Sequence, residues 1–283
     1  MTRPLCYLDG NYLPLQDAGM PLDDLGLQRG YGIFDFLRVS AGVPLFIDDH
    51  LDRFFRSAAI MRLPVQESGE EIRSVIRRLL AENNIPSSGI RILLTGGPSP
   101  DGYRISRPRL AVVQMPMAPA PEELSLTGLR LLTYAFRRQL ADVKTTDYLM
   151  AIWLQPWLKE NGGDDILYHD NGRVSECPRC NFFIVTKEGA LVTPALHMLH
   201  GITRKHVIAL AQGMGIRVEE RDLTVEEVYA ADEAFITAST KRIIPVSQVD
   251  AVALPKSVNA SLTRRLWDAF VHHEAACISS FKK

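Results

Sequence analysis

The stretch DDILYHDNGRVSECPRCNFFIV, Asp164–Val185, carries the strongest structural and chemical signals in the chain. Asn171-Gly172 separates two short runs and predicts a hairpin, because both residues tolerate the positive φ of a two-residue turn. The apolar run that ends the stretch predicts a further strand. A carboxylate, Glu176, and a Cys-x-x-Cys motif lie between the strands, so the chemistry can reside in the carboxylate or in the thiols.

The chain has four cysteines: Cys6, Cys177, Cys180 and Cys277. These are too few for a disulfide framework in a chain of this length. A structural zinc site normally needs four ligands in paired spacing, and no second pair is present. A thioredoxin-like dithiol would open a helix, whereas this motif lies between segments that predict strands. We therefore expect no metal and interpret both thiols as loop neighbours of a site, with a non-catalytic metal or redox protein as the outside alternative.

Length and composition indicate a globular protein. A chain of 283 residues with 46% hydrophobic and 23% charged residues suits two subdomains or one large α/β domain. The net charge of −1 and the pI near 6.7 provide no basic field for nucleic acid or anionic lipid. The N-terminus has no apolar signal region, and no apolar run reaches the roughly 18 residues of a membrane span. The sequence predicts a cytoplasmic protein that binds neither nucleic acid nor membrane.

A Pro-rich segment, PMAPAPEE at 116–123, is the best candidate for a domain boundary. We expect an N-terminal α+β domain over residues 1–117 and a linker over 118–123. Residues 124–283, which include Lys144, should form a mixed α/β C-terminal domain. The expected fold class is therefore α/β with two domains.

Hydrophobic periodicity locates most helices and strands within these domains. Helices are expected over 48–61, 69–83, 145–162 with a kink at Pro156, 201–213 and 256–277. Hairpins are expected around Gly10-Asn11, Ala41-Gly42 and Asn171-Gly172. Further strands are expected in GIRILLTGG, PRLAVVQMPM, LSLTGLRLLTYAF, NFFIV, DEAFITAST and RIIPVSQVDAV.

Several short motifs between Leu8 and Val249 follow one another in an order that is far more specific than any one of them. They are RGYGIFDFLRV, HLDRF, VKTTDY, RVSECPRCNFF, HGITRKHVI and TASTKRIIPV. In this ordered set the chain resembles the fold-type IV pyridoxal-phosphate enzymes, or class IV aminotransferases. That group includes branched-chain aminotransferases, D-amino acid transaminases, aminodeoxychorismate lyases and (R)-selective amine transaminases. The resemblance implies the two-domain D-amino acid aminotransferase-like fold, with residues 124–283 as the cofactor-binding domain.

The resemblance implies roles for three residues around the cofactor ring. Lys144 would hold pyridoxal 5′-phosphate as a Schiff base and then move the proton at the substrate Cα. Glu176 would keep the pyridine nitrogen protonated, because a carboxylate beside a ring cation stabilises its charge. Tyr148 would bond the ring 3′-oxygen, although a core tyrosine is a serious alternative.

The cofactor phosphate needs a cation and several hydrogen-bond donors. Arg53 would supply a fork of N–H groups, and the helix that begins near Gly201 would supply the backbone amides of Ile202 and Thr203. Either Ser239 or Thr240 would complete the phosphate cup.

Two arginines are candidates for the substrate carboxylate, which needs cationic or hydrogen-bonding partners. Arg29 and Arg91, with Tyr31 lining the pocket, resemble a less typical clade of D-amino acid transaminases. The alternative for Arg29 is a turn residue that pairs with Asp23 or Asp24. We expect a D-amino acid donor with 2-oxoglutarate or pyruvate as the acceptor. A branched-chain L-amino acid aminotransferase is the second possibility, ahead of a lyase or an amine transaminase.

Some positions depart from the family pattern. Asp35 stands where many relatives have Glu, and Asp147 where many have Asn, while Cys-Pro-Arg-Cys replaces a loop of small hydroxylated residues. Arg137 and Arg138, close to Lys144 in sequence, are further candidates for substrate or inter-subunit contacts. The family resemblance also implies a homodimer whose active site lies at the domain and subunit interface, with Arg29 contributed across it.

Overall fold

The computed structural model describes residues 4–255 and 261–281, and it divides into two compact units. The first unit takes the chain up to Pro119, the segment Val143–Asp147 and the chain from Cys277. The second unit comprises Ala120–Asp142 and Tyr148–Ala276. The sequence assigned Lys144 to the C-terminal domain, whereas its segment packs with the first unit.

Backbone hydrogen bonds explain this difference. The Phe34 N–H donates to the Lys144 carbonyl over 2.9 Å, and the Thr146 N–H donates to the Gly32 carbonyl over 3.0 Å. These bonds add the segment around Lys144 to a strand more than 100 positions earlier in the chain. Pairing at such a distance leaves no periodic signal in the sequence.

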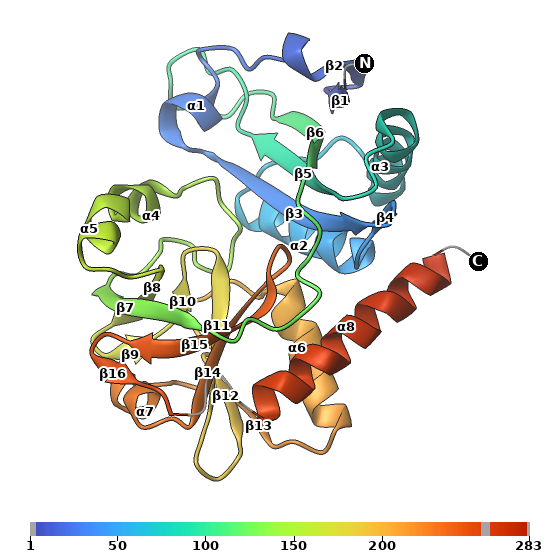
Figure 1. Cartoon of the computed structure of the whole chain (residues 1–283). Helices are drawn as coiled ribbons and strands as arrows, with labels where there is room; N and C mark the ends of the chain where they lie inside the picture. Colours follow the sequence, from blue (N-terminus) through green and yellow to red (C-terminus); the bar gives the residue numbers. More distant parts are fainter. Residues whose placement is uncertain (1–3, 256–260, 282–283) are drawn as a thin grey trace. The chain divides into compact units, whose positions relative to one another are not determined.

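The first unit is built on a six-stranded sheet with the order β2-β1-β6-β5-β3-β4, and all its strand pairs are antiparallel. Helices α2 and α3 lie beside this sheet (Figure 1). The elements of the first unit are β1 (Leu5–Leu8), β2 (Asn11–Pro14), the 3₁₀ helix η1 (Leu15–Asp17), α1 (Leu25–Arg29), β3 (Gly32–Ser40), β4 (Val43–Pro44), α2 (Ile47–Ile60), α3 (Gly69–Asn83), β5 (Ser88–Thr95) and β6 (Arg109–Pro116).

Helix α2 decides where the polar groups of this unit lie. Its buried face carries Leu51 and Phe54, which pack into the same core as Ile33 and Leu37 of β3. The same face also carries Arg53, so the packing that stabilises the helix draws a cation into the interior.

The second unit is built on a sheet of ten strands in the described chain, with the main order β13-β12-β11-β14-β15-β7-β8-β9. Strands β10 and β16 pair outside this path, with β11 and β15. The elements of this unit are β7 (Leu129–Ala135), α4 (Leu149–Trp153), α5 (Gln155–Glu160), β8 (Asp165–Asp170), β9 (Arg173–Val174), β10 (Glu176–Cys177), β11 (Cys180–Val185), β12 (Leu191–Thr193), α6 (Ile202–Gly213), β13 (Val218–Glu220), α7 (Val225–Tyr229), β14 (Glu233–Ala238), β15 (Arg242–Val249) and β16 (Val252–Ala253). Helix α8 spans Ser261–Phe281 and ends in the first unit.

The hairpin expected at Asn171-Gly172 is confirmed. Both residues have positive φ, 49° and 77°, and they join β8 to β9. A second tight turn follows, in which Cys177 and Cys180 are direct cross-strand partners. The next pair in this register is Glu176 with Asn181, so the carboxylate lies on a strand fixed on both sides by short turns.

The expected helices are largely confirmed, with two refinements. The helix predicted over 145–162 is broken into α4 and α5 at Leu154, with Pro156 in the first turn of α5 where a missing N–H costs little. The last helix begins no later than Ser261, and residues 256–260 of the prediction lie outside the described residues. The first turn falls at Asp9-Gly10, one residue before the predicted Gly10-Asn11. In the described ranges no helix combines the length and the apolar character needed to cross a membrane.

Candidate active site

Lys144 lies beside β3, where Thr145 forms an isolated bridge with Ile33. Its Nζ lies 4.5 Å from the centre of the Phe34 ring. The hydroxyl of Thr146 donates to the Gly30 carbonyl over 2.8 Å. The segment that carries the amine is therefore tied to the RGYG motif by both backbone and side-chain bonds.

A buried charged triad underlies the Arg53 position. The Arg53 guanidinium donates from Nε to one oxygen of Asp35 and from Nη2 to the other, each over 2.8 Å. His50, one helical turn before Arg53, places its Nδ1 2.6 Å from Asp35 Oδ1. Asp35 is fully buried and Arg53 is 5% exposed, so β3 and α2 fix this cation from both sides.

The environment holds this triad in one charge state. Burial alone would raise the pKa of Asp35, but Arg53 and His50 beside it hold that pKa well below its usual range. Burial lowers the pKa of His50, although the neighbouring carboxylate opposes the shift. At neutral pH the triad therefore consists of an ionised carboxylate, a guanidinium and a neutral imidazole.

The candidate carboxylate-binding arginines lie in the same unit as Lys144. The guanidinium of Arg91, on β5, lies 5.4 Å from the centre of the Phe34 ring, the ring that Lys144 also contacts. Arg29 donates from Nε to the Gly102 carbonyl over 3.1 Å. In the described chain it pairs with neither Asp23 nor Asp24, so the alternative weighed for it is wrong.

Tyr31 is half-buried, and its hydroxyl donates to the Met61 carbonyl over 2.5 Å. The hydroxyl is therefore used within the fold, and the ring packs against the core of the first unit. Any contact of Tyr31 with a substrate would involve the ring.

Glu176 lies in the second unit, and both of its carboxylate oxygens are hydrogen-bonded. Oε1 accepts from Arg138 Nε over 2.8 Å, and Nη2 of the same guanidinium lies 2.7 Å from it. Oε2 accepts from the Leu199 N–H over 2.9 Å. The Glu176 side chain is 5% exposed. Arg138, a candidate for substrate contact from its sequence position, thus serves this carboxylate.

Tyr148 is the N-cap of α4 and is half-buried. Burial raises the pKa of its phenol, Arg138 opposes that shift and Glu176 adds to it. These effects place Tyr148 in the same electrostatic environment as Glu176 and Arg138. A neutral phenol at neutral pH can donate a hydrogen bond to an anionic oxygen.

The start of α6 has the features of an anion-binding helix terminus. No side chain caps it at Gly201, and Ile202 and Thr203 are both buried. A Cβ at Gly201 would lie 1.9 Å from Asn181 Oδ1, so only glycine allows this approach. Asn181 also donates to the Leu199 carbonyl over 2.7 Å. The loop before α6 is therefore braced by the strand that follows Glu176.

The hydroxyls of Ser239 and Thr240 lie at the tip of the β14–β15 hairpin, and both residues are half-exposed. Thr237, at the end of β14, is the cross-strand partner of Asn181. This register brings the hairpin tip to the end of β11 that also braces the α6 loop. The donor set of the second unit, a helix terminus and hydroxyls with a fixed carboxylate, fits a phosphorylated pyridine cofactor.

Cys177 and Cys180 are free thiols, 0% and 4% exposed, and their side chains belong to the core of the second unit. Burial raises the pKa of the Cys177 thiol well above its usual range. A protonated, buried thiol is a poor nucleophile and a poor metal ligand. In the described residues no group of three or more His, Cys, Asp or Glu side chains could hold a metal ion.

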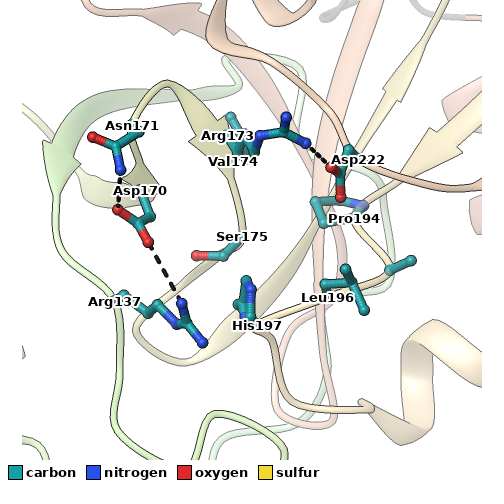
Figure 2. A pocket seen from close by; sticks show the side chains of 11 residues that line it. Arg137, Asp170, Asn171, Arg173, Val174, Ser175, Pro194, Leu196, His197 and Asp222 are labelled. Atoms are coloured by element: carbon teal, nitrogen blue, oxygen red, sulfur yellow. Dashed lines mark hydrogen bonds and ion pairs between the residues drawn. The ribbon is translucent and has the colours of Figure 1, made fainter.

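A polar cavity of about 340 Å³ opens on the second unit beside Ser175, the residue before Glu176. Figure 2 shows Arg137 and Asp170 paired at its edge, with a separation of 3.7 Å. The Arg137 side chain is 51% exposed. The two adjacent arginines therefore differ: Arg138 supports a buried carboxylate, and Arg137 lines an open cavity.

Three supporting residues were not identified from the sequence: His50, Asn181 and Leu199. His50 was detectable in principle, because the HLDR spacing places it on the same helical face as Arg53. Asn181 and Leu199 act through register and a backbone amide, which leave no residue-type signal.

Comparison with known proteins identifies the family. The family model for amino-transferase class IV matches residues 32–249. A Methanocaldococcus jannaschii protein with a provisional name as a branched-chain-amino-acid aminotransferase is 33% identical over 93% of this chain and 94% of its own length. A D-alanine aminotransferase of Listeria monocytogenes is 30% identical over 90% of this chain and 91% of its own length. A solved branched-chain amino acid aminotransferase from T.th., with pyridoxamine 5′-phosphate, has a TM-score of 0.87 at 25% identity, covering 96% of this chain and 94% of that chain.

These matches confirm the resemblance drawn from the ordered motifs, the expected fold class and the expected cofactor. The chain therefore belongs to the class IV aminotransferases of fold type IV and is a pyridoxal-phosphate-dependent aminotransferase.

Proposed function

We propose that the enzyme moves the amino group of a D-amino acid to a 2-oxo acid, 2-oxoglutarate or pyruvate, with Lys144 as the catalytic residue. The observation that carries this proposal is the position of Arg91 and Lys144 against the same Phe34 ring. A cation that binds the substrate carboxylate must lie within a few ångströms of the amine that moves the Cα proton.

The bound pyridoxal phosphate supplies an electron sink that makes the substrate Cα–H bond acidic. The amine of Lys144 then takes and returns that proton. Phe34 packs under the amine and limits its motion, and the bonds of Thr146 to the RGYG motif fix the backbone that carries it. The supporting bonds therefore orient a general base before substrate arrives.

Phosphate binding is assigned to Arg53, to the Ile202 and Thr203 amides, and to Ser239 or Thr240. Support comes from the uncapped start of α6 and from the buried Asp35–Arg53 pair, which fixes the direction of the guanidinium. The phosphate is a dianion near neutral pH, and each of these groups is a cation or a donor.

Glu176 is assigned to the ring nitrogen and Tyr148 to the ring 3′-oxygen. The hydrogen bonds on both Glu176 oxygens favour its ionised form, and an ionised carboxylate retains a proton on the ring nitrogen. The raised pKa of Tyr148 keeps its phenol able to donate.

Arg29 and Tyr31 are assigned to the substrate together with Arg91. Arg29 is exposed at the end of α1 and is anchored to Gly102. We further propose that the enzyme is a homodimer in which Arg29 reaches the partner's substrate. A monomer at micromolar concentration in sedimentation experiments would contradict the dimer.

A second candidate function is the transamination of branched-chain L-amino acids. The observation that favours it is the 33% identity to the Methanocaldococcus jannaschii relative and its name. The two candidates share all the cofactor residues and differ only in which face of the substrate carries the carboxylate.

A half-reaction screen separates these candidates. The cofactor-loaded enzyme is mixed with single D-amino acids, L-amino acids and (R)-amines, and loss of the visible band of the lysine-linked cofactor is followed. Fast loss with D-alanine or D-glutamate is expected, whereas loss only with L-leucine or L-isoleucine would refute D-specificity. Loss only with amines that lack a carboxylate would remove the assigned role of Arg91.

Two variants test the chemistry itself. Lys144→Ala should abolish the visible band, because no other amine is assigned to the cofactor. Replacing both Cys177 and Cys180 with Ser should retain the band, which a redox or metal role of the thiols would not predict.

A further inference from the structure

The assignment of Glu176 to the ring nitrogen leaves one question of electrostatics, namely which partner keeps the shared proton. A carboxylate and a pyridine nitrogen in contact can be arranged as anion and cation, or as neutral acid and neutral base. The second arrangement removes the charge that makes the ring an electron sink.

We infer that Arg138 is a positioning residue that decides this proton position in favour of the ring nitrogen. The inference rests on the proposed role of Glu176. Arg138 donates through Nε to Glu176 Oε1, with Nη2 of the same guanidinium 2.7 Å from that oxygen. A guanidinium beside the carboxylate stabilises its ionised form, so the proton moves to the other partner.

Arg138 is itself held in place. Its Nη2 donates to the Ala141 carbonyl over 2.7 Å, within the turn that follows β7. The side chain is 17% exposed, so solvent screens the pair only weakly. The geometry is thus set by the second unit alone and precedes any bound group.

The second oxygen of Glu176 takes a different kind of donor. The Leu199 N–H is a backbone group and carries no net charge, so it orients the carboxylate without neutralising it. Loss of Arg138 would leave a carboxylate that is 5% exposed and would remove its charged partner. Burial without a cation favours the neutral acid.

The adjacent Arg137 is a matched control. Both arginines follow β7 and differ by one position, but Arg137 is half-exposed and pairs with Asp170 over 3.7 Å at the cavity in Figure 2. Arg137→Met removes the same charge and side-chain type at nearly the same distance along the chain. Within the part of the chain that the structure describes, Arg137 has no bond to Glu176.

The test compares two cofactors on the apoenzyme: pyridoxal phosphate and its 1-deaza analogue, in which a C–H replaces the ring nitrogen. Quenching of the fluorescence of the three tryptophans reports each dissociation constant. Arg138→Met should weaken pyridoxal phosphate binding by roughly tenfold or more and the deaza analogue by less than about threefold, the size of a charge-assisted hydrogen bond. Arg138→Lys should recover most of the difference, and Arg137→Met should change neither constant.

The outcomes separate this inference from the function on which it rests. Equal weakening of both cofactors by Arg138→Met would show a purely structural role and overturn the inference, as would no change in either. If Glu176→Gln leaves the preference for pyridoxal phosphate over the analogue intact, the assignment of Glu176 itself is wrong. If Glu176→Gln abolishes the preference and Arg138→Met does not, only the role of Arg138 is refuted.

Discussion

Asp35→Asn should destabilise the protein far more than any surface charge change. The substitution keeps the size of the side chain but replaces one carboxylate oxygen by an NH₂ donor. Arg53 and His50, which are 5% and 2% exposed at the side chain, would then face a donor in place of an anion. A buried guanidinium without a charged partner is the expected result.

Breaking a buried ion pair from one side costs about 3–5 kcal/mol. The pair has two 2.8 Å bonds and the histidine contact at 2.6 Å, so we expect the upper part of this range. In a chain of this size the loss corresponds to a fall of roughly 6–20 °C in Tm.

The measurement is urea unfolding of the apoenzyme at pH 7.5, which removes stabilisation by bound cofactor. Asp48→Asn is the control, because Asp48 also lies on α2 and pairs with an arginine, Arg73, but is 76% exposed. An exposed pair contributes about 0–1 kcal/mol. If both variants lose the same free energy, the triad does not stabilise the fold and the reasoning fails.

The lowered pKa of His50 predicts that the unfolding free energy falls as pH drops below about 6.5, by at most about 1.4 kcal/mol per pH unit, since the unfolded chain takes up a proton there first. Unfolding of wild type and His50→Gln from pH 8 to 5 should show this slope only in wild type. Gly201→Ala should cost roughly 1–3 kcal/mol and weaken cofactor binding, because its Cβ would meet Asn181 Oδ1, whereas Gly213→Ala, at an open position, should be neutral; equal losses in the two would refute the close approach. Tyr168→Phe should leave stability unchanged or raise it by up to about 2 kcal/mol, because in the described chain its buried hydroxyl has no hydrogen-bond partner; a clear loss in urea unfolding would reveal a missing partner.

Local signals predicted the elements that depend on local chemistry. The hairpin at Asn171-Gly172 forms because two adjacent residues accept positive φ, and α3 begins at Ser68 with a complete capping box to Glu71. The five-residue helices α1 and α7 were not predicted, because five residues are too few to show a period. In α7 the capping box of Thr224 and Glu227 was the available signal.

The candidate site was predicted by residue type and not by connection. Motif order singled out Lys144, Glu176 and Arg53 as residues whose chemistry a family would share, and the family match supports the shared chemistry. Which groups support them depends on contacts between elements distant in sequence, such as Arg138 with Glu176, 38 positions apart. Such contacts are set by sheet register and helix packing, which a single sequence does not display.

The two supported charges follow one physical pattern. Arg53, assigned to the phosphate, is paired with Asp35, and Glu176, assigned to the ring nitrogen, is paired with Arg138. An isolated buried charge would cost several kcal/mol, whereas a pair with good geometry offsets much of that cost. Each pair lies entirely within one unit, so the direction of each charge is fixed without the cofactor. Binding then needs little reorganisation, and the two Cys-x-x-Cys thiols, buried beside Glu176, act as packing around that carboxylate.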